Sequence, residues 1–143
     1  MKALRQLLDE KGHSVVTVQP TETVYAALER MAQHRIGALL VMEGKRPVGI
    51  FSERDYARKV VLNGKSSRTT PVREVMSEKV LYVTPDQTVE ECMAIMTSHH
   101  FRHLPVLESD GSVAGFLSIG DLVKETISAQ QFIIEQMEKY ISS

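Results

Sequence analysis

One apolar run occurs twice in this sequence, and both copies end in Ser-x-x-Asp. Residues 49–55 read GIFSERD and residues 115–121 read GFLSIGD. In each copy strand-like apolar residues give way to a helical pattern, so the serine and the aspartate fall where a strand passes into a helix N-terminus. Unpaired backbone N–H groups gather at such an end and attract anions. Two such ends related by a repeat indicate a pair of similar sites.

The repeat extends well beyond these two runs. Pro20 aligns with Pro85 and Thr23 with Thr88, a constant spacing of 65 residues that becomes 66 at the two aspartates because the second hairpin turn is one residue longer. Repeated units of this length often cannot bury their apolar faces alone. We therefore expect one globule built from two units that pack against each other.

Each unit is expected to have the order β-α-β-β-α, which makes the fold class α+β. A short strand at 15–18 or 80–83 ends at a proline, and an amphipathic helix follows it. Two apolar runs joined by a turn then predict a hairpin, and a last helix closes the unit. We divide the chain into residues 1–64 (first unit with an N-terminal helix), 65–74 (linker) and 75–143 (second unit with a C-terminal helix).

The C-terminal helix is expected to carry apolar residues beyond the second unit. Ile133, Met137, Tyr140 and Ile141 recur there at helical spacing. Packing on the core of the same chain would explain them, and so would a contribution to a self-association interface. The sequence leaves both explanations open.

Two roles fit the pairs Ser52 with Asp55 and Ser118 with Asp121. Ser-x-x-Asp at a helix start is a capping arrangement in its own right, and such a cap contributes about 1 kcal/mol. Alternatively, the carboxylate accepts hydrogen bonds from a sugar diol beside a helix end that attracts phosphate. A serine can cap a helix and also donate to a phosphate oxygen, so the two roles are compatible.

The stretch 53–73 is the basic region of the chain. Six basic residues stand there against Glu53 and Asp55, which gives a local charge of +4 in a protein of formal net charge −1. Arg54 and Arg58 lie four positions apart, where a bound anion would relieve their repulsion, although a solvated helix face is the more common explanation of such a run. The same stretch also holds Lys59 and the neutral donors Ser66, Ser67, Thr69 and Thr70.

The histidines do not form a metal-binding pattern. His99 and His103 have the spacing of one helical turn, but the expected helix ends between them, and neither a His-Glu-x-x-His motif nor a neighbouring cysteine is present. We therefore expect no metal. Arg102 and His103 are interpreted instead as a cation and a titratable donor at the start of a strand.

No catalytic motif stands out, and we expect no enzyme activity. A Gly-x-Ser-x-Gly elbow, a phosphate-binding Walker loop and a Gly-x-Gly-x-x-Gly fingerprint are all missing from the sequence. Gly37 and Ala38 start an apolar strand with small side chains. They offer either a place for a flat group close to the backbone or room for tight helix packing.

Charge and hydropathy limit the partners and the compartment. A net charge of −1 gives no overall field for nucleic acid, and no apolar run is long enough to span a membrane. The single cysteine, Cys92, fits a reducing compartment and a place in the core. The N-terminus lacks the apolar centre of a signal peptide. We expect a cytoplasmic protein that binds neither nucleic acid nor membrane.

These motifs together resemble the tandem cystathionine-β-synthase (CBS) domain pair, or Bateman module, in its stand-alone form. The likeness covers nearly the whole chain. The segments that carry it are Thr23-Val24 with Met31, His34–Leu39, Gly49–Asp55, Phe101–Val106 and Gly115–Asp121. It implies two units packed sheet to sheet about a pseudo-twofold axis, with two clefts for adenine nucleotides such as AMP, ATP or NAD.

The resemblance also implies roles for individual residues. Adenine would lie against the strand edges, the ribose would bind Asp121 or, in the symmetric cleft, Asp55, and phosphate would approach Ser118 or Ser52. Lys11 is a weaker candidate. The nucleotide-binding residues implied in this way are Val16, Ile36, Gly37, Ala38, Ser52, Arg54, Asp55, Arg58, Lys59, Ser66, Ser67, Thr70, Arg102, His103, Ser118 and Asp121.

The function that follows is a regulatory sensor without catalysis, which responds to an adenine nucleotide by a change in shape or association. The resemblance implies a homodimer and leaves the regulated protein unidentified. The alternative is a ligand-free module for dimerisation or protein interaction, in which both Ser-x-x-Asp motifs only cap helices. Because the second motif has Gly120 where the first has the charged Glu53-Arg54, the two clefts need not bind the same ligand and need not both be occupied.

Overall fold

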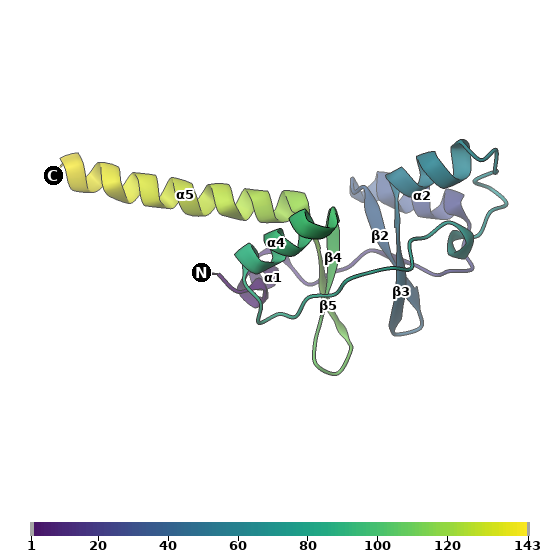
Figure 1. Cartoon of the computed structure of the whole chain (residues 1–143), viewed down its shortest axis with the longest axis horizontal. Coiled ribbons are helices and arrows are strands. Elements are labelled where there is room, and N and C mark those ends of the chain that lie inside the picture. The colour runs from purple at the N-terminus through teal and green to yellow at the C-terminus, as the bar shows by residue number, and fades with distance from the viewer. Residues whose placement is uncertain (1, 143) are drawn as a thin grey trace.

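The computed structural model describes residues 2–142. Two α+β units lie side by side, and a long C-terminal helix projects from the second (Figure 1). The first unit comprises β1 (Thr17–Val18), α2 (Val24–His34), β2 (Ala38–Glu43), β3 (Arg46–Ser52), α3 (Glu53–Asp55) and η1 (Tyr56–Val61). The second comprises α4 (Val89–His99), β4 (His103–Leu107), β5 (Val113–Ser118) and α5 (Ile119–Ser142). Helix α1 (Leu4–Lys11) precedes the first unit, and the short helix η2 (Val72–Glu74) lies between the two units.

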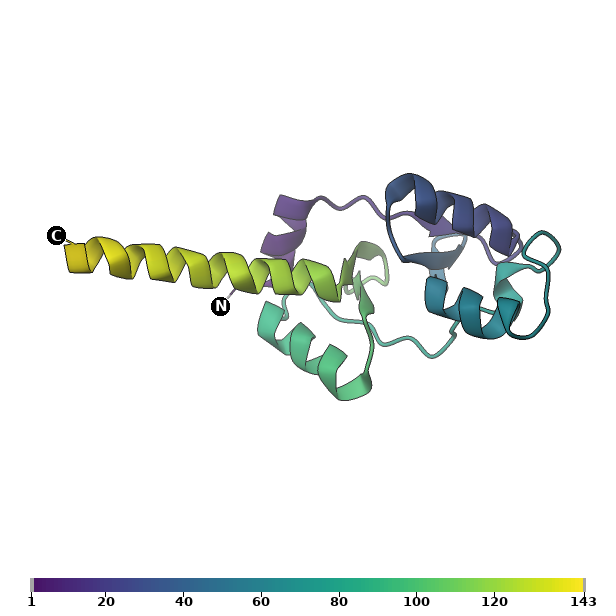
Figure 2. The same cartoon turned by 90° about the horizontal axis from the view of Figure 1, so that it is seen from above.

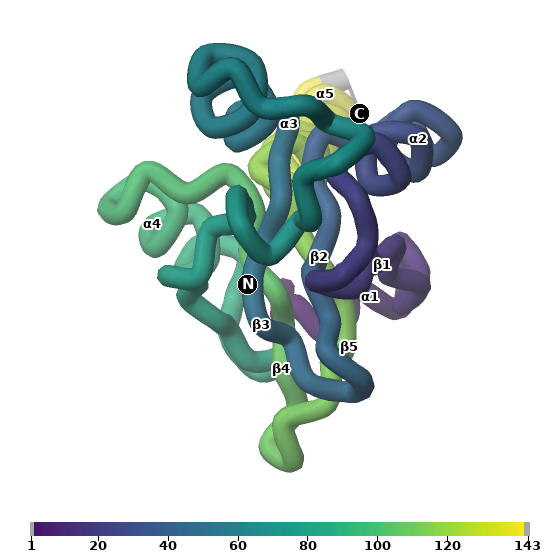
Figure 3. Tube along the Cα trace, turned by 90° about the vertical axis from the view of Figure 1, so that its right-hand side faces the viewer, coloured from purple at the N-terminus to yellow at the C-terminus, as the bar shows by residue number. Residues whose placement is uncertain are grey.

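The repeated order that the sequence predicts is confirmed in both hairpins and both amphipathic helices. Strands β2 and β3 pair antiparallel with Leu39 opposite Phe51, and β4 and β5 do the same with Leu104 opposite Leu117. Figure 3, which looks along the long axis, shows the β2–β3 hairpin in front of the β4–β5 hairpin. Each unit thus turns one small sheet toward the other.

One predicted strand is wrong. In the first unit β1 runs parallel to β2, but the matching stretch 80–83 makes only an isolated bridge, between Val83 and Val106. The Val83 N–H donates to the carbonyl of Pro105 at 3.1 Å. In a parallel ladder the next bond toward Leu81 would need the N–H of Pro105, which proline lacks. The partner strand therefore stops this strand from extending.

The buried stripes of the two amphipathic helices match the sequence prediction. Val24, Ala27 and Met31 of α2 are buried in one core, and Val89, Cys92 and Met96 of α4 in the other. Both helices begin with the same cap, because Thr23 accepts a hydrogen bond from the Ala26 N–H and Thr88 accepts one from the Glu91 N–H, each at 3.1 Å.

The units exchange the segments that complete their cores. Leu4, Leu7 and Leu8 of α1 are buried with the second unit, whereas Val72 and Val75 beside η2 are buried with the first. The predicted boundaries at 64 and 75 separate the two sequence repeats. The core of the second unit also includes α1, which precedes the first unit, and the core of the first includes the η2 segment, which precedes the second. A change in the relative position of the units must therefore move both segments.

Matching backbone hydrogen bonds hold both exchanged segments. Val89 donates to the carbonyl of Lys2 at 3.0 Å, and Val24 donates to the carbonyl of Thr70 at 2.9 Å. The next contacts, from Leu4 to Gln87 and from Val72 to Glu22, also correspond. The two dockings are therefore related by the same pseudosymmetry as the repeats.

Two glycines permit this close approach. A Cβ added to Gly115 would overlap Leu8, and one added to Gly49 would lie 2.9 Å from the carbonyl oxygen of Ser77 and 2.8 Å from the sulfur of Met76. These positions open the two Ser-x-x-Asp runs, so the glycines of the repeated motif leave room for the exchanged segments.

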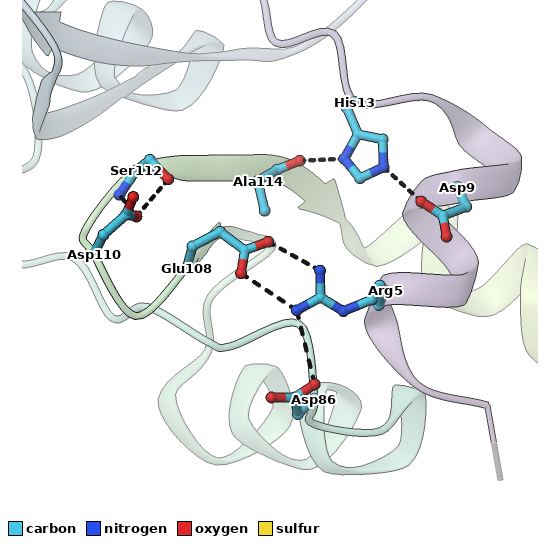
Figure 4. Close-up of polar contacts among 8 residues, drawn as sticks. All are labelled: Arg5, Asp9, His13, Asp86, Glu108, Asp110, Ser112 and Ala114. Atoms are coloured by element: carbon cyan, nitrogen blue, oxygen red, sulfur yellow. Dashed lines mark hydrogen bonds and ion pairs between the residues drawn. The ribbon is translucent and has the colours of Figure 1, made fainter.

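Polar contacts fix α1 to the second unit (Figure 4). The Arg5 guanidinium donates to both carboxylate oxygens of Glu108, at 3.0 and 3.3 Å, and also lies 3.8 Å from Asp86. The two ring nitrogens of His13 face the Ala114 carbonyl at 2.8 Å and the Asp9 carboxylate at 2.7 Å. Both ends of α1 are thereby tied to its host.

Among residues 2–142, no helix combines the length and the apolar character that a membrane-spanning segment requires.

Candidate functional site

Both Ser-x-x-Asp motifs form the reciprocal cap that the sequence suggests. The Ser52 hydroxyl accepts a hydrogen bond from the Asp55 N–H at 3.2 Å, and the Asp55 carboxylate accepts one from the Ser52 N–H at 3.0 Å. In the second motif Asp121 N–H donates to Ser118 at 3.1 Å, and the Ser118 N–H donates back at 2.8 Å. Capping is thus one role of all four side chains.

A cleft of about 550 Å³ opens beside the first motif. It lies between the units, because the β3–α3 corner forms one wall and the start of β4 forms another. Of the residues implied by the resemblance, it is lined by Gly37, Ser52, Arg54, Asp55, Arg58, Lys59, Arg102 and His103. The structure thus brings these eight implied residues together in one cleft, with members on both walls.

The cleft is strongly cationic. Five basic side chains line it against the carboxylates of Glu53 and Asp55, which leaves a net charge of +3 when its histidines are neutral. Burial lowers the pKa of His103 below its usual range, although Asp121 acts in the opposite direction. The imidazole of His103 stacks on Phe116 with ring centroids 5.5 Å apart. The cleft therefore combines several cations, which can bind an anion, with the neutral imidazole of His103, which can donate a hydrogen bond.

Asp55 is held more fully than a simple cap requires. Its Oδ2 accepts hydrogen bonds from both the N–H and the hydroxyl of Ser52, while its Oδ1 accepts the Ser77 hydroxyl and lies 3.1 Å from the Lys59 ammonium. The residue is 9% exposed. A ligand hydroxyl that binds this carboxylate must displace one of these partners, and Lys59 is the mobile one, because its side chain is long and partly exposed.

The second motif is engaged differently. The Lys11 ammonium donates to Asp121 at 2.7 Å and to the carbonyl of Phe116 at 2.9 Å. Burial raises the pKa of Asp121, but the hydrogen bonds from Lys11 and Ser118 outweigh it and the net pKa is lowered. Asp121 and Lys11 also line a groove of about 780 Å³ between α1 and α5.

The residues implied for adenine lie at the edges of the first unit. Ala38 is buried and pairs with Ser52 across the β2–β3 hairpin, while Val16 and Ile36 pack partly buried against the same core. The carbonyl of Gly37 accepts the Glu53 N–H at 3.0 Å. Of these four implied residues, Gly37 is the one that lines the 550 Å³ cleft.

The linker donors lie apart from the residues that line this cleft. The Ser67 carbonyl accepts the Tyr25 N–H at 2.9 Å, and the Thr70 carbonyl accepts the Val24 N–H at 2.9 Å. The Ser66 hydroxyl accepts the Arg68 N–H at 3.3 Å. In this structure Ser67 and Thr70 therefore dock the linker on the start of α2, and Ser66 stabilises a turn within the linker.

Sequence reasoning missed several residues that line the cleft. The matched hydrogen bonds pair Val72 with Leu4, so seven residues further on Lys79 corresponds to Lys11. The repeat could therefore have indicated Lys79. Ser77 carried no comparable signal, because it reaches Asp55 only after the linker folds back on β3. The missed residues are Ile50, Glu53, Ser77, Lys79, Val80, Leu81, His100 and Phe101.

Two histidines stack on phenylalanine rings, and the cysteine lies in the core. His99 stacks on Phe101 and His103 on Phe116, and within residues 2–142 no three His, Cys, Asp or Glu side chains gather as a metal site would require. Burial raises the pKa of Cys92 to about 11, so its thiol stays protonated in the core.

Comparison with known proteins establishes the family. The CBS domain profile matches residues 9–62 and 72–128, and the chain belongs to the CBS-domain family. It is 38% identical over 125 residues to the mitochondrial CBS domain-containing protein CBSX3 of Arabidopsis thaliana, covering 84% of this chain and 60% of that protein. The chain thus spans less than two thirds of that relative.

Solved structures agree in fold. A protein with CBS domains from Burkholderia ambifaria MC40-6 is 49% identical, with a TM-score of 0.85 over 90% of this chain and 96% of the other. The CBS domain protein PAE2072 of Pyrobaculum aerophilum, in complex with AMP, is 26% identical, with a TM-score of 0.74 over 83% of this chain and 88% of the other. The fold is that of a tandem CBS module.

Proposed function

We propose that this chain is a non-catalytic sensor that binds an adenine nucleotide in the cleft beside Ser52 and Asp55. The observation that carries the proposal is the ring of five basic side chains around a capped helix start at the boundary of the two units. These are Arg54, Arg58, Lys59, Lys79 and Arg102. The AMP complex of the Pyrobaculum relative supports a nucleotide as the ligand.

The geometry suggests how the ligand is held. Phosphate groups lie among the arginines of the β3–α3 corner and Arg102, since guanidinium groups bind phosphate in a bidentate manner. Lys59 moves from Asp55 to a phosphate oxygen, and the freed Oδ1 accepts a ribose hydroxyl. Ser77 and Ser52 keep the carboxylate in place during this exchange.

Binding acts on the arrangement of the two units, because the cleft takes side chains from both. Arg58 comes from the first unit and Arg102 from the second. A phosphate that both of them bind favours one relative position of the units over others, and this difference in affinity is what shifts the population. The signal is therefore a change of shape or of association, with no bond made or broken in the ligand.

Isothermal titration calorimetry with AMP, ADP, ATP and NAD tests the proposal, with inorganic phosphate as the control ligand. The variant Arg58→Gln removes a cleft cation. The matched control Arg68→Gln removes an arginine that lies over the ring of Tyr25 in the linker, 4.1 Å from its centroid. We expect Arg58→Gln to weaken the preferred nucleotide by about tenfold or more and Arg68→Gln to leave it unchanged.

Equal losses in both variants would place the ligand elsewhere. Absence of binding by every nucleotide to protein freed of copurified ligand would contradict the proposal and favour the ligand-free interaction module.

A further inference from the structure

Helix α5 begins inside the second unit and leaves it after two turns. Leu122 is fully buried, and the Thr126 hydroxyl donates to the Leu122 carbonyl at 2.9 Å and lies 3.3 Å from the sulfur of Met93 on α4. The C-terminal part of the helix projects past α1 and α4 in two perpendicular views (Figures 1 and 2). Most helical stability in proteins comes from the packing of an apolar face, and the projecting part of α5 carries such a face without a cover from the rest of this chain.

The exposed apolar side chains follow a heptad pattern. The spacing alternates between four and three residues, which is the signature of a coiled-coil seam. The β-branched Ile127, Ile134 and Ile141 occupy one core position, a. The other core position, d, is occupied by Val123, Gln130 and Met137. Apart from Gln130, all these side chains are large, apolar and exposed.

We propose that α5 pairs with α5 of a second copy in a parallel, in-register, two-stranded coiled coil along this seam. β-Branched isoleucine at the three a positions beyond the second unit is typical of two-stranded parallel coiled coils, although d here is not the usual leucine. In a parallel pair Gln130 meets Gln130 of the second copy, and the two amides can donate to and accept from each other. An antiparallel pair would place Gln130 against Ile134, where its amide would be desolvated without a partner.

The flanking positions permit the same arrangement. A parallel pair brings Thr126 beside Gln131 of the second copy. One heptad later it brings Ile133 beside Glu138. No two like charges meet across the seam.

The exposed surface is large enough for a stable dimer. Full burial of an aliphatic side chain removes roughly 100 Å² from water, so the partly exposed apolar residues of α5 from both copies offer roughly 1,000 Å². Specific interfaces begin at about this size. Ile133, at the flanking position g, adds apolar surface beside the strict seam.

Sedimentation equilibrium of the full chain tests the pairing. The variant Met137→Glu places a charge in the seam, and the matched control Phe132→Glu places the same charge on another face of α5. These two side chains are almost equally exposed, at 61% and 62%. We expect a dimer whose dissociation constant rises by at least about tenfold in Met137→Glu and changes little in Phe132→Glu.

A monomeric wild type at roughly 100 μM would overturn the proposal. Equal weakening by the two variants would also overturn it, because the interface would then lie off the seam. Nucleotide binding does not enter this test, which is made on ligand-free protein.

Cross-linking tests the register. Gln130→Cys should form an intermolecular disulfide with oxidised glutathione, whereas Ser128→Cys, on the outer face of the pair, should not. The natural Cys92 is fully buried and stays out of the reaction. A dimer in which the Gln130→Cys variant fails to cross-link, or in which both variants cross-link equally, would contradict the parallel in-register pair.

Discussion

The two repeats hold the same motif by different means. In the first, Ser77 pairs its backbone with Ile50 and donates its hydroxyl to Asp55. In the second, the ammonium of Lys11 serves both positions, because it donates to the carbonyl of Phe116, which corresponds to Ile50, and to the motif's aspartate. Asp55 thus takes a neutral hydroxyl from the exchanged segment, and its cation, Lys59, comes from the following helix of the same unit. Asp121 instead takes its cation, Lys11, from the exchanged segment.

This difference shows that a repeated motif need not give a repeated site. The strand–helix corners match closely, and the exchanged segments decide how each aspartate is satisfied. From the lysine of each segment to the strand valine at 18 or 83, the first segment is three residues longer than the second. We infer that this difference in length directs Lys11 at its aspartate, while Lys79 lines the cleft of the other motif.

The largest expected difference between the repeats concerns the exchanged side chains themselves. Leu8 is 1% exposed over Gly115, whereas its counterpart Met76 is only half-buried over Gly49. Leu8→Ala should lower the free energy of unfolding by about 2–5 kcal/mol and Met76→Ala by less than half as much. Urea titrations of both variants measure this. Equal losses would show that the two segments support their cores equally.

The glycines beneath these segments should differ in the opposite sense. Gly49→Ala would meet the backbone carbonyl of Ser77, which cannot move alone, and should cost about 1–3 kcal/mol. Gly115→Ala would meet side-chain atoms of Leu8, its two methyls and Cγ, which can shift without moving the backbone, and should cost less. Thermal unfolding of the two variants ranks them. A larger loss at Gly115 would mean that Leu8 has no freedom to move.

Removing Lys11 should change the titration of Asp121. Lys11→Met deletes the donor that most strongly lowers the pKa of this carboxyl, so the pKa should rise in a carboxyl-detected NMR titration. A lowered folded-state pKa contributes stability that is present above the unfolded value near 4 and lost as the pH falls through the folded value. The stability lost above pH 5 should stay within about 1 kcal/mol, since Lys11 is partly exposed. An unchanged pKa would contradict the ion pair.

The smallest expected effect is the pH dependence at His13, which only the first segment has. Both ring nitrogens face acceptors, an arrangement that only the imidazolium can satisfy, and the hydrogen bond to Asp9, followed by that to Ala114, raises the pKa of His13. Its stabilisation should be complete below the unfolded value near 6.5 and be lost as the pH rises through the higher folded value. Urea midpoints of wild type and His13→Gln should therefore converge by pH 9. A constant difference would contradict this assignment.

The sequence predicted what depends on local pattern. The repeat, the amphipathic helices, the hairpins and the caps at Ser52 and Ser118 follow from periodicity and from residue type at helix ends. The strand at 80–83 was wrong because the obstacle, Pro105, lies on its partner and acts through pairing. The exchange of α1 and η2 was not predicted, since both dockings join residues far apart in the sequence.

The candidate site divides in the same way. Arg54, Arg58 and Lys59 lie within or just after the first motif in the sequence and were predicted to line the cleft. Ser77 and Lys79 were not predicted, because they reach the cleft through the segment that follows the linker. The compartment and the regulated partner have no local signal of this kind. The compartment stays a prediction from the composition and the N-terminal sequence, and the regulated partner stays unidentified.

Amide chemical-shift mapping by NMR during titration with AMP, and then with ATP, tests the central claim most directly. We expect the largest shifts at the first motif and at the start of β4, around Ser52, Glu53, Arg102 and His103. Shifts confined to Lys11, Ser118 and Asp121 would place the nucleotide at the second motif and contradict the account.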